Sequence, residues 1–215
     1  MGLVLVYGAA RGLSEYAREA GVEAMRGAQA TSPADSTIPF TALSTDRIDQ
    51  SLWAPERVRA FARSIAIPAA PAGLLHIPSV RLQVPVYPGT SELNLNRGAG
   101  HIEGTAALLP NGNVGIAGHR DGFFRRLKDV GLGDEIHLQA AAGSMRYRVA
   151  EISIVEPEDT SPLAQGGAPS LTLVTCYPFY FVGTAPQRYI VRAELVDVQL
   201  PAEDRPIPVS KEVMP

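Results

Sequence analysis

Short apolar runs separated by turn residues dominate the chain from about residue 74 onward. They are rich in Val, Ile, Leu and Tyr, and Gly, Pro, Asn and Asp interrupt them: LLHIPSVRLQVPVYPG (74–89), GNVGIAGH (112–119), DEIHL (134–138), MRYRVAEISIV (145–155), LTLVT (171–175) and RYIVRAELVDV (188–198). Several runs alternate with a period of two residues, which is typical of β-strands joined by turns. With almost no helical pattern between the runs, the sequence predicts an all-β domain that is an antiparallel barrel or sandwich.

The run MRYRVAEISIV has a mixed pattern. Tyr147, Val149 and Glu151 fall on one side of the predicted strand, whereas Ile152 and Ile154 fall on the other. Strict alternation therefore gives this strand no face that is apolar along its whole length.

Two segments before residue 74 have helical patterns instead. Residues 13–29 have helical composition, and a Ser/Thr/Pro-rich linker follows at 30–46. A second helix is expected within residues 51–66, where Pro55 suits a first helical turn. One face of that helix is expected to pack on a core through Trp53, Val58, Phe61 and Ile65.

The first residues allow two interpretations. The apolar run GLVLVYGAA (2–10) is soon interrupted by the charged residues Arg11, Glu15, Arg18 and Glu19. Since a membrane-spanning helix needs about 20 apolar residues, this segment cannot cross a membrane as given. It is either the end of a longer spanning helix, in which case Met1 is not the natural start, or the beginning of an ordinary amphipathic helix. We therefore divide the chain into a helical appendage with its linker (1–50), a β-domain (51–200) and a tail (201–215).

Composition excludes several classes of function. The chain has 215 residues, of which 46 % are hydrophobic, so it can bury a core. Lys and Arg total 19 against 22 acidic residues, a net charge of −3 that argues against nucleic acid as the main partner. One Cys excludes an internal disulfide and a Cys-rich zinc site, and the four histidines form no metal-spaced pair.

The single thiol, Cys176, ends the run LTLVT. In a strand that stops there, Thr172, Val174 and Cys176 face one side, while Leu171, Leu173 and Thr175 face the other. Free cysteine is often a small buried hydrophobe, but at the end of a strand it can also be a nucleophile facing a cleft. The sequence around the thiol leaves both interpretations open.

Two further residues favour the nucleophile. His119 follows a predicted strand directly after Gly118, and an imidazole beside a thiol can hold the thiolate–imidazolium pair. Arg188 begins a run expected to be antiparallel to LTLVT, so its guanidinium should return near Cys176, where it can stabilise an oxyanion. Asp121 can orient His119, or it can pair with Arg120 or Arg125.

Together these motifs resemble the sortase family of cysteine transpeptidases. TLVTC (172–176) matches the family's TLxTC motif, and His119 and Arg188 stand where the family has its histidine and arginine. The segments most similar to class D sortases are GHIEGTA (100–106), AGHRD (117–121), GDEIHL (133–138) and TCYPFYFVGTAPQRYIVRA (175–193). The resemblance covers about residues 52–198 and implies a closed eight-stranded sortase-type β-barrel with short helices and an N-terminal helical appendage.

The resemblance also implies roles for individual residues. Cys176 would be the nucleophile that forms an acyl-thioester, His119 the proton donor and acceptor, and Arg188 the group that stabilises the oxyanion and positions the substrate. Substrate-binding residues are expected to be Thr175, Thr172, Ala117 and His101, the last without a role in proton transfer. The loop at 156–170 would bind the sorting motif, although from its composition alone it is a solvated connector.

The function implied is cleavage of a C-terminal LPxTG- or LPxTA-type sorting motif and transfer of the substrate protein to an amine. The acceptor would be a peptidoglycan precursor or a pilin lysine, and the enzyme would work at the extracytoplasmic face of the membrane, associated through its N-terminus. No cofactor is needed, and no acidic cluster supports a calcium site. Two alternatives remain: a cysteine endopeptidase that hydrolyses the same intermediate, and a non-catalytic binding module that uses the aromatic patch YPFYF (177–181).

Overall fold

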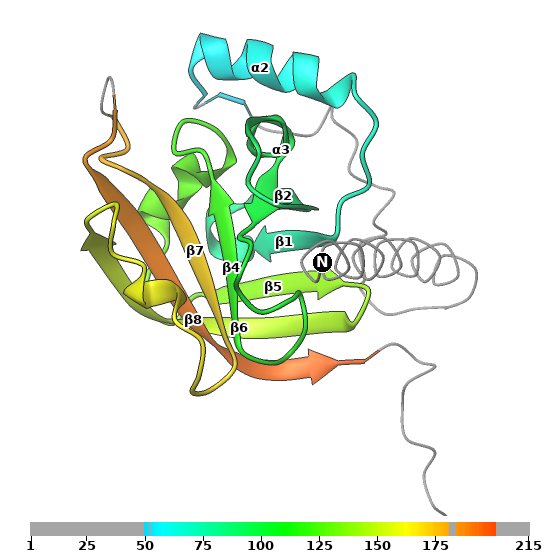
Figure 1. Ribbon diagram of the computed structural model, residues 1–215, viewed down its shortest axis with the longest axis vertical. Helices are drawn as coiled ribbons and strands as arrows, with labels where there is room; N and C mark the ends of the chain where they lie inside the picture. The colour runs from blue at the N-terminus through cyan, green and yellow to red at the C-terminus, as the bar shows by residue number, and fades with distance from the viewer. Residues whose placement is uncertain (1–49, 52, 181–183, 201–215) are drawn as a thin grey trace, which may run out of the picture.

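The computed structural model describes residues 50–200, apart from 52 and 181–183 (Figure 1). The helix expected at 13–29, its linker and the tail at 201–215 lie outside the described residues. Within the described part of the chain, no helix is long and apolar enough to cross a membrane.

Eight strands form a closed barrel, as expected. In chain order they are β1 (Gly73–Ile77), β2 (Leu82–Pro88), β3 (Ala99–His101), β4 (Asn113–Gly118), β5 (Glu135–Ala140), β6 (Gly143–Val155), β7 (Ser170–Tyr177) and β8 (Gln187–Gln199). Around the barrel the order is β1-β2-β3-β4-β7-β8-β6-β5. Each strand of the closed barrel has a neighbour on both sides, so the barrel has no exposed sheet edge.

The barrel is not purely antiparallel, and here the sequence prediction was wrong. Among the described strands, β2 pairs with β3 and β4 pairs with β7 in parallel. Parallel neighbours need a crossover connection, and these two pairs are joined through α3 (Glu92–Arg97) and through β5 and β6 respectively. Alternation along a strand cannot reveal which strand lies beside it, so the pattern could not predict this mixture.

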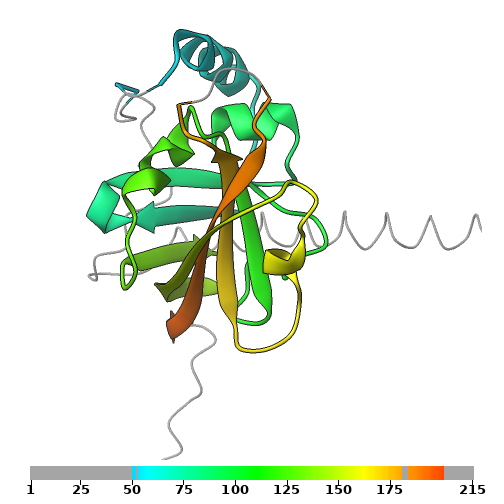
Figure 2. The same ribbon diagram turned by 90° about the vertical axis from the view of Figure 1, so that its left-hand side faces the viewer.

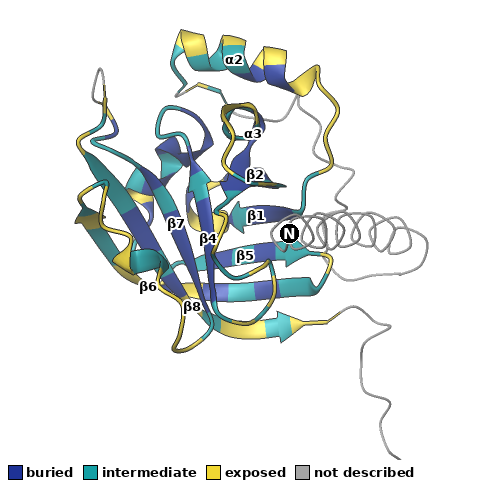
Figure 3. Ribbon diagram, in the orientation of Figure 1, coloured by how far each residue is buried: buried dark blue, intermediate teal, exposed yellow. Residues whose placement is uncertain are grey.

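All eight strands contribute buried apolar residues to the core cluster inside the barrel, and Figure 3 shows these buried positions along the strands. In β6 the inward residues Tyr147 and Val149 are buried as the alternation predicted, but register shifts follow Arg146 and Val149. Because a bulge reverses the faces beyond it, Glu151 is exposed and Ile152 packs against the core. The mixed pattern of this run is therefore explained by two irregularities within one long strand.

Two helices lie at one end of the barrel (Figure 1). The expected helix is α2 (Pro55–Ile65), with Pro55 in its first turn, whereas α3 was missed because six residues are too few to show a helical period. Trp53 and Phe61 pack edge-to-face against Phe123, with ring centroids 4.8 and 6.1 Å away. Phe123 begins the 3₁₀ helix η4 (Phe123–Asp129), and α2 packs on it through these aromatic rings, as predicted. The expected contact of Ile65 with the core was wrong, because this side chain is 43 % exposed.

Replacing Gly118 with alanine is expected to destabilise the barrel. An added Cβ would lie 2.7 Å from ring atoms of Phe124, which is fully buried. We expect the free energy of unfolding to fall by about 1–3 kcal/mol, the usual cost of overpacking a filled core. Urea unfolding followed by circular dichroism measures the change. Gly131→Ala is the control, since its Cβ would meet nothing within 4 Å, and an equal loss in both variants would contradict the prediction.

Candidate active site

The three residues expected to do chemistry lie at the same end of three neighbouring strands. β7 is paired with β4 on one side and with β8 on the other. Cys176 stands directly opposite Arg188, and Thr175 stands opposite Gly118. His119 is the residue after Gly118, so it follows β4 at the same end of the sheet at which Cys176 stands on β7. Hydrogen bonding of the sheet thus brings the three residues from distant parts of the sequence to one end of the barrel, and their action as a catalytic group stays a prediction.

Cys176 points away from the interior of the barrel. Leu171 and Leu173 are fully buried in the core, and successive side chains of a strand face opposite sides. Thr172, Val174 and Cys176 therefore share the outward face, as the sequence predicted. The thiol is free and only partly buried.

Three apolar residues lie side by side on this outward face, at a level two residues before the thiol. Val174 pairs with Ala117 of β4 and with Ile190 of β8. We call Ala117, Val174 and Ile190 the apolar strip. A peptide that crosses this strip along the direction of β7 would reach Cys176 near the end of the strand.

The loop between β6 and β7 (residues 156–169) is fastened to the barrel beside the strip. Its 3₁₀ helix η5 (Ser161–Leu163) lies beside β4 (Figure 2), and the carbonyl of Pro162 accepts a hydrogen bond of 2.8 Å from the side-chain amide of Asn113. The side chain of Gln165 donates 3.0 Å to the carbonyl of Asn113. Leu163 lies 3.0 Å from where a Cβ on Gly115 would be, so this loop covers part of the outward face.

The four residues expected to bind substrate occupy different environments. Ala117 belongs to the apolar strip and is half-buried. Thr172 is fully buried, and its hydroxyl lies 2.8 Å from Asn113 Oδ1 and 3.2 Å from the carbonyl of Pro162. Thr175 is also buried and donates 2.8 Å to the carbonyl of Gly118, which ties the end of β4 to β7. The two threonines hold the frame of the site, and contact with substrate stays a prediction for both.

His101 lies apart from His119. It pairs with Ile116, two residues before the end of β4, whose side chain is part of the core. His101 Nε2 is 2.8 Å from the carbonyl of Ala106 and 3.2 Å from the hydroxyl of Thr105. These bonds fix the imidazole within its own turn, and its role toward substrate stays a prediction.

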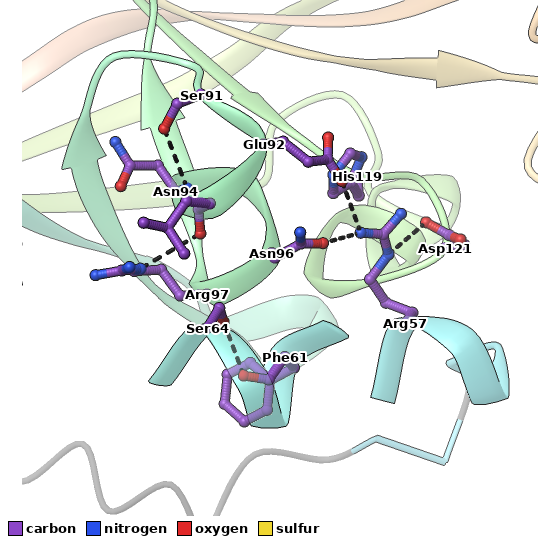
Figure 4. A network of polar contacts seen from close by, with 11 residues as sticks. Arg57, Phe61, Ser64, Ser91, Glu92, Asn94, Asn96, Arg97, His119 and Asp121 are labelled. Atoms are coloured by element: carbon purple, nitrogen blue, oxygen red, sulfur yellow. Dashed lines mark hydrogen bonds and ion pairs between the residues drawn. The ribbon is translucent and has the colours of Figure 1, made fainter. Parts of the chain in front are cut away.

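Charged groups from separate segments of the chain surround His119 (Figure 4). Its side chain is 20 % exposed, and Nε2 lies 3.4 Å from Glu92 Oε1. Burial lowers the pKa of His119 most, and the cation of Arg57 lowers it further, whereas the carboxylates of Glu92 and Asp121 raise it. The ion pair of Asp121 joins Arg57 of α2 at 3.1 Å, a partner 64 residues away that no local pattern could reveal.

The chain after the thiol is held near the site by arginine and aromatic contacts. Arg120 donates 3.1 Å to the carbonyl of Pro178, and Arg188 donates 3.1 Å to its neighbour's carbonyl at Gln187. Of the YPFYF patch, Phe179 is buried against Tyr189 with ring centroids 5.1 Å apart. The 72 % exposed Tyr180 lies against the guanidinium of Arg125. In the described part of the patch, which ends at Tyr180, Phe179 is thus buried and Tyr180 is exposed, while Phe181 lies outside the described residues.

The described residues at these strand ends form no cluster of metal ligands. Among the described residues, no group of three or more His, Cys, Asp or Glu side chains could hold a metal ion. A cavity of about 270 Å³ lies instead between α2 and α3, lined by Ala60, Arg63, Ser64, Ile67, Leu93 and Asn96.

Comparison with known proteins identifies the family. A family model described as a sortase domain matches residues 75–196, which is more than half of the chain. The chain is 36 % identical over 126 residues to sortase D of Bacillus subtilis (strain 168), covering 58 % of this chain and 64 % of that protein. It is 30 % identical over 128 residues to sortase A of Bacillus anthracis, covering 58 % and 59 %. The chain therefore spans less than two thirds of the length of these curated relatives.

Solved structures agree with this result. A Clostridium perfringens sortase D5 transpeptidase superposes with a TM-score of 0.54 at 27 % identity, covering 65 % of this chain and 89 % of that one. Listeria monocytogenes sortase A superposes with a TM-score of 0.56 at 25 % identity, covering 61 % and 91 %. The chain belongs to the sortase family, and the recognition of that family and its barrel from sequence is confirmed.

Removing the hydroxyl of Thr172 should loosen the loop between β6 and β7. Thr172→Val loses the bonds to Asn113 and Pro162, so we expect the free energy of unfolding to fall by about 0.5–1.5 kcal/mol. Hydrogen exchange at the amides of Leu163 and Ala164 should become faster, because η5 loses its anchor. Thr172→Ser keeps the hydroxyl and is the control. If serine is as harmful as valine, the hydroxyl is not the anchor.

Proposed function

We propose that this protein is a cysteine transpeptidase that cleaves a C-terminal sorting motif of the LPxTG or LPxTA kind and joins the substrate protein to an amine. The observation that supports it best is the pairing of β7 with β4 and β8 in a sortase barrel, which puts Cys176 opposite Arg188 and places the end of β4, just before His119, beside Thr175. A thiol, an imidazole and a guanidinium in one place supply a nucleophile, a proton carrier and an oxyanion partner.

In the first half of the reaction, the thiolate of Cys176 attacks the carbonyl carbon of the motif's threonine. Arg188 stabilises the negative charge on the oxygen of the tetrahedral intermediate. As the peptide C–N bond breaks, His119 gives its proton to the departing amine, and a thioester on Cys176 remains. In the second half, the acceptor amine gives a proton to His119 and attacks the thioester, which releases the thiolate and forms a new amide bond.

The apolar strip is the proposed seat for the leucine and proline side of the motif. An extended peptide laid over Ala117, Val174 and Ile190 would bring its threonine carbonyl toward the thiol at the end of β7. The loop at 156–170 would border this peptide and contribute to specificity, since η5 is fastened beside the strip. Thr172 and Thr175 would serve the substrate by holding this frame, and His101 would contribute from the neighbouring turn.

By kinship with sortases, we infer that the enzyme works at the extracytoplasmic face of the cell membrane. Its substrates would be proteins with a C-terminal sorting signal, and its acceptor a peptidoglycan precursor or a pilin lysine. Residues 51–200 would form the catalytic domain, with residues 1–50 as the segment that connects it to the membrane. The reaction as written needs no cofactor.

Substitution of the three site residues should give graded losses of acyl-enzyme. Cys176→Ala should abolish the adduct, His119→Ala should nearly abolish it, and Arg188→Ala should slow it about 10²–10³-fold, the usual cost of one oxyanion donor. Mass spectrometry of protein mixed with a panel of LPxTG- and LPxTA-type peptides measures the adduct. Arg148→Ala removes an exposed arginine from β6 and is the control. Turnover by Cys176→Ala above background would exclude this thiol as the nucleophile.

An amine acceptor separates transfer from hydrolysis. If the thioester is resolved by an amine, adding one should convert the Cys176 adduct into a ligated peptide and speed its disappearance. A plain cysteine endopeptidase would release only the hydrolysed acid, at a rate that the amine does not change. A thiol that forms no adduct and resists iodoacetamide at neutral pH would favour the binding module, because a buried thiol is inert.

A further inference from the structure

One arginine of α2 joins three groups around the histidine of the site. Arg57 Nε lies 3.1 Å from Asp121 Oδ1, and its Nη1 lies 3.7 Å from Glu92 Oε1 and hydrogen-bonds to the side-chain oxygen of Asn96 (Figure 4). The guanidinium thus links α2 to α3 and to the turn that carries His119. Its stem also packs on that turn, because Arg57 Cγ lies 3.5 Å from where a Cβ on Gly122 would be.

The carboxylate of Glu92 lies between this guanidinium and the imidazole. Its Oε1 is 3.4 Å from His119 Nε2 and 3.7 Å from Arg57 Nη1. Glu92 is 70 % exposed at its side chain, whereas Arg57 is only 15 % exposed and has several partners. The arginine is therefore the fixed member of the pair, and the glutamate is the member that can move toward or away from the histidine.

We propose that Glu92 and Arg57 are opposed positioning residues for His119, and that the docking of α2 sets the orientation and charge of this imidazole. Glu92 Oε1 lies 3.4 Å from Nε2, and its negative charge favours the imidazolium. Arg57 disfavours the imidazolium and restrains both carboxylates near it. The consequence for catalysis depends on the function proposed above, but the electrostatic coupling does not.

Several other groups surround His119 and enter the same balance. The charged groups that act on the imidazole are Arg57 from α2, Glu92 from α3 and Asp121 from its own turn. Arg120 is the next residue in the chain, and the strand pairing brings Cys176 of β7 and Arg188 of β8 to the same end of the barrel. The pKa of His119 lies below its ordinary value, so a neighbouring carboxylate is needed to favour the charged form that a thiolate–imidazolium pair requires. Of the two acidic side chains, Glu92 is the one in contact with the ring.

The packing of α2 on η4 holds Arg57 beside Glu92 and His119. Trp53 and Phe61 hold the helix on Phe123, four residues after His119 in the chain. A shift of α2 would therefore move Arg57 and the turn of His119 together. A mere clamp would also join these elements, but it would not act on the histidine with opposite signs at Arg57 and Glu92.

The test is the titration of His119 by ¹⁵N-edited NMR of the imidazole in the full chain. Cys176→Ala is used as the background, because it removes the thiol whose titration would couple to the ring. The signal is assigned by its loss in His119→Gln. Arg57→Gln should raise the titration midpoint, since a nearby cation is lost, and Glu92→Gln should lower it, since a nearby anion is lost.

Two controls separate charge from geometry. Arg59→Gln removes an equal charge from an exposed position of the same helix and should leave the midpoint unchanged. Arg57→Lys keeps the positive charge but loses the planar guanidinium that reaches Asp121 and Asn96. The titration midpoint of His119 in Arg57→Lys should therefore lie closer to that of the parent protein than the midpoint in Arg57→Gln does. Circular dichroism checks folding, and Glu92→Gln, a change at an exposed side chain, keeps the test available if Arg57 variants unfold.

Activity provides a second, separate measurement. With Cys176 present, Glu92→Gln should lower kcat by as much as about 10²-fold with little change in KM, as expected for a misplaced proton carrier. Midpoints that do not move, or that move in the same direction in Arg57→Gln and Glu92→Gln, would overturn the proposal. If the parent protein acylates no peptide, the proposed function fails, whereas the titration still decides the coupling.

Discussion

β7 is hydrogen-bonded along its length to β4 on one side and to β8 on the other, and the site depends on this double pairing. The parallel register with β4 delivers His119, and the antiparallel register with β8 delivers Arg188. A slip of one residue on either side would turn the partner side chain to the opposite face of the sheet. Register is therefore as important to this site as the identity of the three residues.

The fold protects that register from both faces of β7. On the inside, Leu171 and Leu173 are fully buried, so a slip would expose them and bury polar groups. On the outside, Thr172 binds the loop between β6 and β7. Thr175, on the inner side like the two leucines, binds the end of β4. Four residues before the cysteine therefore stabilise the register of β7: Leu171, Thr172, Leu173 and Thr175. A rigid frame of this kind holds reacting groups within the narrow range of geometry that catalysis requires.

Charge around His119 comes from outside the barrel. The helices α2 and α3 supply Arg57 and Glu92, and an aromatic cluster holds α2 against η4. The barrel brings the imidazole to the thiol, while the helices decide which charges surround it. The helical lead-in is in this respect part of the site, although its sequence has no chemical motif of its own.

Alternating apolar runs predicted a β-domain and most of its inward positions, because alternation is a local feature of the chain. The ordered TLVTC, His and Arg motifs resembled the sortase family, and that resemblance implied the closed barrel. Tertiary structure decided the parallel pairing of β4 with β7, the bulges of β6, and the cluster that joins Arg57, Glu92 and Asp121 to His119. These features depend on contacts between distant segments, and a one-dimensional pattern contains no information about which segments meet. Nothing in the sequence distinguishes Glu92 or Arg57 from other charged residues. Only their positions beside the imidazole of His119 show that they can influence its charge.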